Sequence, residues 1–253
     1  MILAGGRGSR LSEETAVRPK PLVEIGGRPI IWHIMSIYAH YGIDDFVVCA
    51  GYKGYQFKEY FANLALHNAN VTIDLATGNI TYHDENRASW RVTVADTGDD
   101  TMTAGRVLRA ARFLEPGEPF CLTYGDGVAD VDVAATIAFH REQGKLATMA
   151  AVLPPARFGI LELDGPTVRA VFEKNPATLT PVNGGFFVVE PEVLDLIAGD
   201  SSVWETDVLV PLAEKGQLAA YEHRGFWQPM DTVYEKDLLE ELWRTGDAPW
   251  KVW

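Results

Sequence analysis

A cluster of glycines follows the first predicted strand, Met1 to Ala4, of this 253-residue chain. The segment 3–10 reads Leu-Ala-Gly-Gly-Arg-Gly-Ser-Arg, so two arginines are interleaved with the glycines. Glycine allows backbone N–H groups to approach a phosphate closely. The spacing matches neither G-x-G-x-x-G nor the P-loop pattern G-x-x-x-x-G-K-[ST]. Taken alone, such a cluster is more typical of a tight turn with a surface arginine.

Two lysines could add fixed positive charge to this loop. Lys20 lies in the segment 18–21 (Arg-Pro-Lys-Pro), where two prolines restrict the backbone, and Lys174 directly follows Glu173. Phosphoryl transfer requires cations beside the phosphate oxygens, because charge on those oxygens is stabilised in the transition state. A single lysine is more often a solvated surface residue. The combination of lysines with the glycine loop is what indicates phosphate chemistry.

A carboxylate stands at a position where α/β proteins bind ligands. Asp126, between Gly125 and Gly127, follows the predicted strand 119–124 at its carboxyl end, where ligands gather in parallel sheets. Magnesium favours one or two carboxylates together with phosphate oxygens and water. Asp231 is the candidate partner of Asp126. Its position before a predicted helix is equally typical of a helix N-cap.

Asp130 and Asp132 form a second acidic pair with D-x-D spacing. Metal-dependent glycosyltransferases use this spacing to hold their ion. Asp132 stands immediately before an apolar run with helical periodicity, however, and aspartate is a preferred N-cap residue. We therefore expect Asp132 to cap a helix.

Strand and helix patterns alternate along most of the chain. The predicted strands are 1–4, 45–50, 119–124 and 147–153, and the predicted helices between them are 30–41, 55–66 and 131–143. This alternation indicates an open, mostly parallel α/β sheet. Two segments, 71–96 and 160–173, are expected to add antiparallel hairpins, and the tail is expected to contain helices at 191–198, 204–215 and 233–244.

Composition narrows the possible classes of protein. Lys plus Arg total 22 and Asp plus Glu total 35, a net charge of −13, which argues against nucleic-acid or anionic-membrane binding over the whole surface. No apolar run approaches the roughly 18 residues of a membrane span, and the start lacks the pattern of a secretory signal. We therefore expect a cytoplasmic protein that interacts with no membrane. Without a linker or repeat, one domain, 1–253, is expected.

Four motifs in this order resemble those of the sugar-1-phosphate nucleotidylyltransferases. They are Gly-Gly-Arg-Gly-Ser-Arg-Leu at 5–11, Arg-Pro-Lys-Pro at 18–21, Gly-Asp-Gly at 125–127 and Glu-Lys at 173–174. Further segments are similar to the glucose-1-phosphate cytidylyltransferase branch, namely 12–15, 32–35, 124–130, 183–187 and 226–232. The resemblance extends over nearly the whole chain.

The resemblance implies a Rossmann-like nucleotidyltransferase fold and dependence on Mg²⁺. It also implies condensation of CTP with α-D-glucose 1-phosphate to CDP-glucose and pyrophosphate, a product used in deoxysugar biosynthesis. Separately, we expect the chain to form a homo-oligomer. Residues 1–153 would form the nucleotide-binding core. Residues 154–253 would form the sugar-phosphate-binding part and a helical C-terminal extension.

By the same resemblance, residues take four roles. Nucleotide-binding residues would be Leu3, Ala4, Gly5, Gly6, Arg7, Gly8, Ser9, Arg10, Lys20, Thr101, Arg106 and Gly125. The sugar phosphate would meet Gly159, Glu173, Lys174, Asn183 and Gly184. Asp126 and Asp231 would bind the metal, and Arg10, Lys20 and Asp126 would be catalytic.

Three alternatives remain open at this point. A uridylyl- or thymidylyltransferase would use the same chemistry on another nucleotide. A glycosyltransferase would use Asp130 and Asp132 as its metal site and would release no pyrophosphate. A non-catalytic sensor would bind a nucleotide sugar without turnover.

Overall fold

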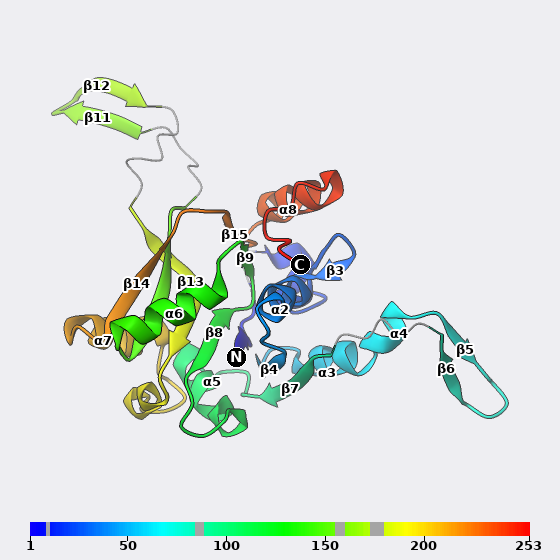
Figure 1. Cartoon of the computed structure of the whole chain (residues 1–253). Helices are drawn as coiled ribbons and strands as arrows, with labels where there is room; N and C mark the ends of the chain where they lie inside the picture. The colour runs from blue at the N-terminus through cyan, green and yellow to red at the C-terminus, as the bar shows by residue number, and fades with distance from the viewer. Residues whose placement is uncertain (9–10, 84–88, 155–159, 173–179) are drawn as a thin grey trace.

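The computed structural model describes residues 1–253 except 9–10, 84–88, 155–159 and 173–179 (Figure 1). Its centre is a seven-stranded sheet with strand order β14-β10-β13-β8-β1-β4-β7. In that order the strands are β14 (Leu218–His223), β10 (Ala147–Val152), β13 (Val182–Val189), β8 (Phe120–Tyr124), β1 (Ile2–Ala4), β4 (Asp45–Ala50) and β7 (Arg91–Asp96). Only β13 pairs antiparallel with its neighbours in this sheet. The mostly parallel α/β fold is therefore confirmed.

Alternation along the strands divides the core into two clusters. In β1, Ile2 and Ala4 enter one cluster and Leu3 enters the other. The first cluster includes residues of α2 (Ile30–His40), α3 (Gly54–Ala62), α6 (Val133–Gln143) and α8 (Val233–Thr245). The second includes residues of α5 (Thr103–Ala110), η5 (Pro191–Leu196), η6 (Trp204–Leu209) and α7 (Val210–Glu214). Helices thus cover both faces of the sheet, as a parallel sheet requires.

Shorter elements complete the chain. The remaining helices are α1 (Ser12–Thr15), η2 (Lys20–Leu22), α4 (Leu64–Asn68) and η3 (Ala111–Phe113). Four two-stranded ladders pair β2 (Glu24–Ile25) with β3 (Arg28–Pro29), β5 (Val71–Ile73) with β6 (Ile80–Tyr82), β9 (Gly127–Ala129) with β15 (Trp227–Pro229), and β11 (Ile160–Asp164) with β12 (Thr167–Phe172). Figure 1 shows β5–β6 and β11–β12 extending away from the sheet. Across the described ranges, no helix has the length and apolar character that crossing a membrane needs.

Several sequence predictions need correction. Only the first half of 71–96 forms a hairpin, because β7 pairs parallel with β4 in the main sheet. The predicted helix 55–66 is two helices that meet at Asn63, and the predicted helix 204–215 begins as a π-helix. The C-terminal part also supplies β13 and β14, which the sequence analysis did not predict. The hairpin at 160–173 is confirmed.

Candidate functional site

The glycine-rich loop lines a cavity of about 760 Å³ at the carboxyl ends of β1 and β8. These strands are parallel neighbours, and the Gly125 N–H donates to the Leu3 carbonyl at 3.0 Å. A Cβ atom on Gly125 would lie 2.8 Å from that carbonyl oxygen, so only glycine allows the approach. The contact brings Asp126 beside the glycine loop.

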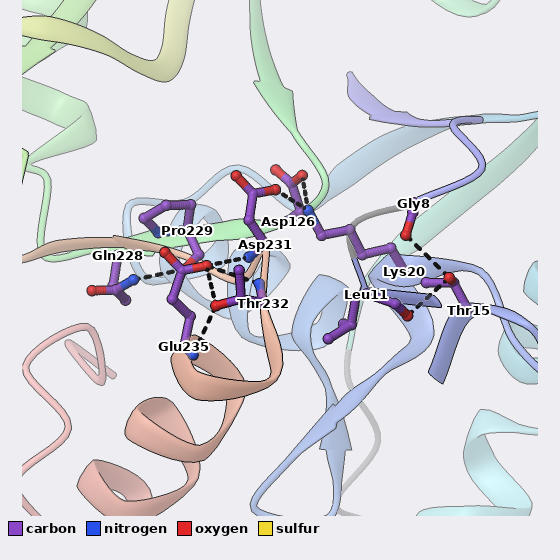
Figure 2. A network of polar contacts seen from close by, with 10 residues as sticks. All are labelled: Gly8, Leu11, Thr15, Lys20, Asp126, Gln228, Pro229, Asp231, Thr232 and Glu235. Atoms are coloured by element: carbon purple, nitrogen blue, oxygen red, sulfur yellow. Dashed lines mark hydrogen bonds and ion pairs between the residues drawn. The ribbon is translucent and has the colours of Figure 1, made fainter. Parts of the chain in front are cut away.

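Lys20 joins two carboxylates at the edge of this cavity (Figure 2). Its Nζ donates to Asp126 Oδ2 at 2.7 Å and to Asp231 Oδ1 at 2.5 Å. The residue is only 7% exposed, although both carboxylates line the cavity. Residues from three distant parts of the sequence therefore form one charged cluster, Lys20–Asp126–Asp231.

The β9–β15 ladder brings Asp231 to Asp126. Gly127 in β9 pairs with Pro229 in β15, and the Met230 N–H donates to the Asp126 carbonyl at 2.8 Å. The N-cap of α8 is Thr232, whose hydroxyl accepts from the Glu235 N–H in a capping box. The alternative that Asp231 is the N-cap is therefore wrong, and its side chain is directed to Lys20 instead.

The Asp126 and Asp231 carboxylates fit a magnesium ion. They converge on a single cation, the Lys20 ammonium, so the protein already accommodates positive charge between them. The described ranges contain no cluster of three or more His, Cys, Asp or Glu side chains that could hold a metal. Two carboxylates completed by phosphate oxygens and water is an arrangement that Mg²⁺ favours.

Arg106 lies against Gly5 of the glycine loop and is 5% exposed. Its guanidinium donates to Thr97 Oγ1 at 2.9 Å and to the Gly98 and Asp99 carbonyls at 2.6 and 3.1 Å. Burial lowers the pKa of this guanidinium. A Cβ atom on Gly5 would lie 2.2 Å from Arg106 Nη1. Arg106 therefore packs against Gly5 of the loop and adds a buried positive charge to the cavity wall.

Gly8 closes the loop against Lys20. Its φ of +63° lies in the left-handed region, and a Cβ atom there would lie 2.8 Å from Thr15 Cγ2 and 3.1 Å from Lys20 Cβ. The Thr15 hydroxyl is within hydrogen-bonding distance of the Gly8 and Leu11 carbonyls, at 3.0 and 2.9 Å (Figure 2). Glycine is thus required here both by conformation and by space.

Most of the described candidate residues line this one cavity. They are Leu3, Ala4, Gly5, Gly6, Arg7, Gly8, Lys20, Thr101, Arg106, Gly125, Asp126 and Asp231. Two others are not among its lining residues: Asn183 donates to Tyr124 Oη at 3.1 Å, and the Gly184 carbonyl accepts from Trp227 Nε1 at 2.8 Å. Five candidates lie outside the described residues, namely Ser9, Arg10, Gly159, Glu173 and Lys174.

Sequence reasoning missed several side chains that line the cavity, among them Thr103, Tyr124, Glu205 and Trp227. Tyr124 had a usable signal, because it ends the strand before Asp126. Glu205 had none: it falls in a predicted α-helix, and periodicity does not reveal that the chain opens there into a π-helix. Burial and a hydrogen bond to Glu205 raise the pKa of the Tyr124 phenol.

Asp130 and Asp132 do not form a shared site. Asp132 Oδ1 accepts from the Ala135 N–H at 2.8 Å and caps α6, which confirms the expected cap. Asp130 Oδ1 instead lies 3.0 Å from His223 Nε2. The glycosyltransferase alternative therefore loses the residue pair on which it depended.

Comparisons with known proteins identify the family of this chain. Residues 1–241 match the family model described as nucleotidyl transferase. The chain is 53% identical over 253 residues to the glucose-1-phosphate cytidylyltransferase of Salmonella typhi, covering 100% of this chain and 98% of that protein. It is 41% identical over 256 residues to a protein of Bacillus subtilis (strain 168) named "Probable glucose-1-phosphate cytidylyltransferase", covering 100% and 99%.

A solved structure shows the same fold. HddC from Yersinia pseudotuberculosis, crystallised with GMP-PN, aligns with a TM-score of 0.68 over 96% of this chain and 97% of that one. The two sequences are 19% identical in the alignment. At that identity the likeness concerns the fold alone.

Proposed function

Because the chain belongs to the nucleotidyl transferase family, we propose that it joins CTP to α-D-glucose 1-phosphate and releases pyrophosphate. The observation that carries the chemistry is the cluster Lys20–Asp126–Asp231 beside the glycine loop. End-to-end identity of 53% with the Salmonella typhi enzyme supports this choice of nucleotide and sugar.

The proposed reaction is a direct in-line displacement. An oxygen of the glucose 1-phosphate phosphate attacks the α-phosphorus of CTP, a new P–O bond forms, and the bond to the β-phosphate oxygen breaks. CDP-glucose and pyrophosphate are the products. The attacking oxygen is already anionic, so no general base is needed. The obstacle is repulsion between two anionic substrates, which positioning and positive charge overcome.

The described residues can supply both requirements. Nothing lies within 4 Å of a Cβ position on Gly6, so the backbone there is free to approach the CTP phosphates, and Arg106 packs against Gly5 of the same loop. Lys20 supplies charge where the substrates meet, and Arg10 and Lys174 would add to it. Asp126 and Asp231 would hold Mg²⁺, which when bound supplies positive charge to the phosphate oxygens.

The proposal extends to the organisation of the protein. Residues 1–153 would bind the nucleotide and 154–253 the sugar phosphate, with Asp231 completing the metal site from the second part. We further propose a cytoplasmic location and a homo-oligomeric state. Size-exclusion chromatography with light scattering would test the oligomer, since a monomer at enzymatic concentrations would contradict it.

Pyrophosphate release tests the activity. The purified chain is incubated with glucose 1-phosphate and Mg²⁺ in parallel with CTP, UTP, dTTP, ATP or GTP. We expect release that strongly prefers CTP and depends on both substrates. The Asp126→Asn variant serves as the control for a contaminating enzyme, because it removes one proposed metal ligand at nearly constant shape.

The other outcomes each identify an alternative. Preference for UTP or dTTP would retain the displacement chemistry and reject the cytidylyltransferase assignment. Binding of CDP-glucose without turnover of any nucleotide would favour a sensor. Transfer of glucose from CDP-glucose to an added acceptor, without pyrophosphate release, would favour a glycosyltransferase.

A further inference from the structure

A network of hydrogen-bonded polar side chains lies in the cavity wall next to the charged cluster. Tyr124 Oη donates to Glu205 Oε1 at 2.5 Å, and the Thr103 hydroxyl lies 3.3 Å from Glu205 Oε2. Asn183 Nδ2 donates to Tyr124 Oη at 3.1 Å. The residues come from four separate elements, β8, η6, α5 and β13: Tyr124 and Thr103 contact Glu205 itself, and Asn183 contacts Tyr124. None of these contacts is used by the phosphoryl chemistry proposed above.

The donor and the acceptor of each hydrogen bond in this network can be assigned. The Gly185 N–H donates to Asn183 Oδ1 at 2.8 Å, which leaves Asn183 Nδ2 to face Tyr124 as a donor. Tyr124 therefore accepts from Asn183 and directs its own proton to Glu205. The Thr103 hydroxyl accepts from the Trp204 N–H at 2.7 Å and has its proton available for Glu205. Glu205 is thus an acceptor in both contacts.

Packing holds Glu205 in place. The preceding residue, Trp204, is fully buried and meets the Phe187 ring edge-on at 5.8 Å, and Phe187 meets the Tyr124 ring edge-on at 5.7 Å. A Cβ atom on Gly185 would lie 2.5 Å from the Tyr124 ring, so this glycine allows the ring its position. Glu205 stands in the first turn of a π-helix, a rare form found frequently at functional sites. Such support is what a preorganised binding group needs.

Glu205 has capacity for further hydrogen bonds. A carboxylate offers about four acceptor positions, and Tyr124 and Thr103 use two of them. Because Glu205 lines the cavity, the remaining positions can accept from a ligand there. A carboxylate cannot donate, so its partners are N–H or O–H groups of the ligand, and a hexose offers only O–H groups. Two neighbouring hydroxyls of a sugar ring match its two oxygens.

We propose that Glu205 determines specificity for the sugar by accepting hydrogen bonds from hydroxyl groups of the hexose. This inference rests on the proposed function. The glycine loop follows β1, whereas Tyr124 ends β8 and Asn183 lies in the next strand, β13. With the CTP phosphates on the loop, the hexose occupies the β8–β13 side of the cavity, where Glu205 lies. Tyr124 and Thr103 act as positioning residues for its carboxylate.

The test compares wild type with Glu205→Gln on a set of sugar phosphates. The kcat/KM values are measured for glucose 1-phosphate, its monodeoxy analogues and its 4-epimer, galactose 1-phosphate, at saturating CTP. A hydrogen bond to a charged group changes kcat/KM by about 10- to 100-fold. We expect Glu205→Gln to lose that factor on glucose 1-phosphate, mainly through KM. We expect no further loss with the analogue that lacks the recognised hydroxyl, because the same interaction is already absent.

Two further variants separate recognition from structure. Tyr124→Phe keeps the ring that packs on Phe187 and removes the hydroxyl that donates to Glu205 and accepts from Asn183, so it is expected to shift selectivity in the same direction by a smaller factor. Glu214→Gln removes an exposed carboxylate in the neighbouring helix α7 and is expected to behave as wild type. Thermal unfolding of each variant is measured alongside the kinetics.

The experiment can overturn the inference in three ways. Equal losses on every sugar phosphate, with a lowered Tm, would make Glu205 a structural residue. Changed discrimination between CTP and dCTP, with unchanged sugar selectivity, would assign Glu205 to the ribose. An unchanged Glu205→Gln enzyme would remove the role altogether. Wild type inactive with CTP and glucose 1-phosphate would overturn the proposed function as well, which distinguishes the two failures.

Discussion

The two ends of helix α8 lie in opposite electrostatic settings. Its first turn follows Asp231, which pairs with the Lys20 ammonium at the cavity. Its last turns carry Trp243, whose ring meets the fully buried His33 edge-on at 4.7 Å. His33 Nε2 lies 2.9 Å from the Ile25 carbonyl. The first end therefore contacts the charged cluster Lys20–Asp126–Asp231, called the open cluster below because it lines the cavity. The other end contacts an aromatic cluster around the buried His33, called the closed cluster below.

The partners explain the difference between these clusters. Lys20 meets two carboxylates, so burying its cation is compensated by opposite charge. His33 meets a carbonyl and the Trp250 indole N–H, which donates to His33 Nδ1 at 3.3 Å. A neutral imidazole with its proton on Nε2 satisfies both contacts. Burial lowers the pKa of His33 to about 4. Buried basic residues thus indicate chemistry only where opposite charges and a cavity accompany them.

Removing charge from the open cluster is expected to have the largest effect. Asp126→Asn or Lys20→Ala should reduce the rate of pyrophosphate release about 10²- to 10³-fold. Lys20→Ala removes a positive charge that stabilises the transition state, and Asp126→Asn removes a proposed ligand of the ion that would supply another. Steady-state kinetics would measure the loss. Circular dichroism of each variant would establish that the fold persists.

Matched controls for these variants lie on the exposed surface. Asp195→Asn and Lys215→Ala change the same residue types outside the cavity and are expected to keep wild-type rates. Near-normal turnover of Asp126→Asn would show that the cluster Lys20–Asp126–Asp231 has only a structural role, like the aromatic cluster at the other end of α8.

Protonation is expected to destabilise the closed cluster. The unfolded chain binds a proton at His33 below pH 6.5, whereas the folded chain does so only below about pH 4. Stability therefore falls as the pH drops through this window, by about 2 kcal/mol for this residue between pH 7 and pH 5. Urea unfolding at the two pH values would show a smaller drop for His33→Gln than for wild type. His40→Gln, on the exposed part of α2, should retain the wild-type drop.

A matched pair of glycines can sharpen the comparison inside the open cluster. Nothing lies within 4 Å of a Cβ atom on Gly6, so Gly6→Ala should leave Tm unchanged while it weakens CTP binding about tenfold by obstructing the phosphates. Gly125→Ala meets the Leu3 carbonyl and should lose about 1 to 3 kcal/mol of stability. Calorimetry of CTP binding and thermal unfolding would separate the two. Equal CTP affinity in Gly6→Ala and wild type would reject the loop as the phosphate site.

Local patterns were enough to predict much of this architecture. The glycine loop, Lys20 and the Gly-Asp-Gly motif each stand in a short segment, and their combination indicated phosphate chemistry although none did so alone. Strand and helix periodicity placed four of the seven strands of the main sheet at nearly their observed bounds. Asp132 as a helix cap was confirmed for the same reason, since a cap depends on neighbouring residues only.

What could not be predicted depends on contacts between distant segments. The β9–β15 ladder decides that Asp231 faces Lys20 while Thr232 caps the helix, and two short strands leave little signal in the sequence. The position of β13 in the sheet depends on its antiparallel pairing with β8 on one side and β10 on the other, and this pairing is not visible in the sequence of β13 alone. Glu205 lies in a π-helical turn, and the residues of this turn show the same periodicity as an α-helix, so the sequence did not indicate that Glu205 lines the cavity.

The smallest expected effect concerns the first turn of α8. Thr232→Ala removes the hydroxyl that accepts from the Glu235 N–H, and loss of such a cap costs about 1 kcal/mol. The Glu235 carboxylate also accepts from the Asp231 N–H at 2.8 Å, so loosening the cap should disturb Asp231 as well. We expect a slightly lowered Tm together with a raised Mg²⁺ requirement for activity. Thr232→Ser keeps the hydroxyl and should restore both. A lowered Tm with an unchanged Mg²⁺ requirement would show that the cap stabilises the helix without positioning the carboxylate.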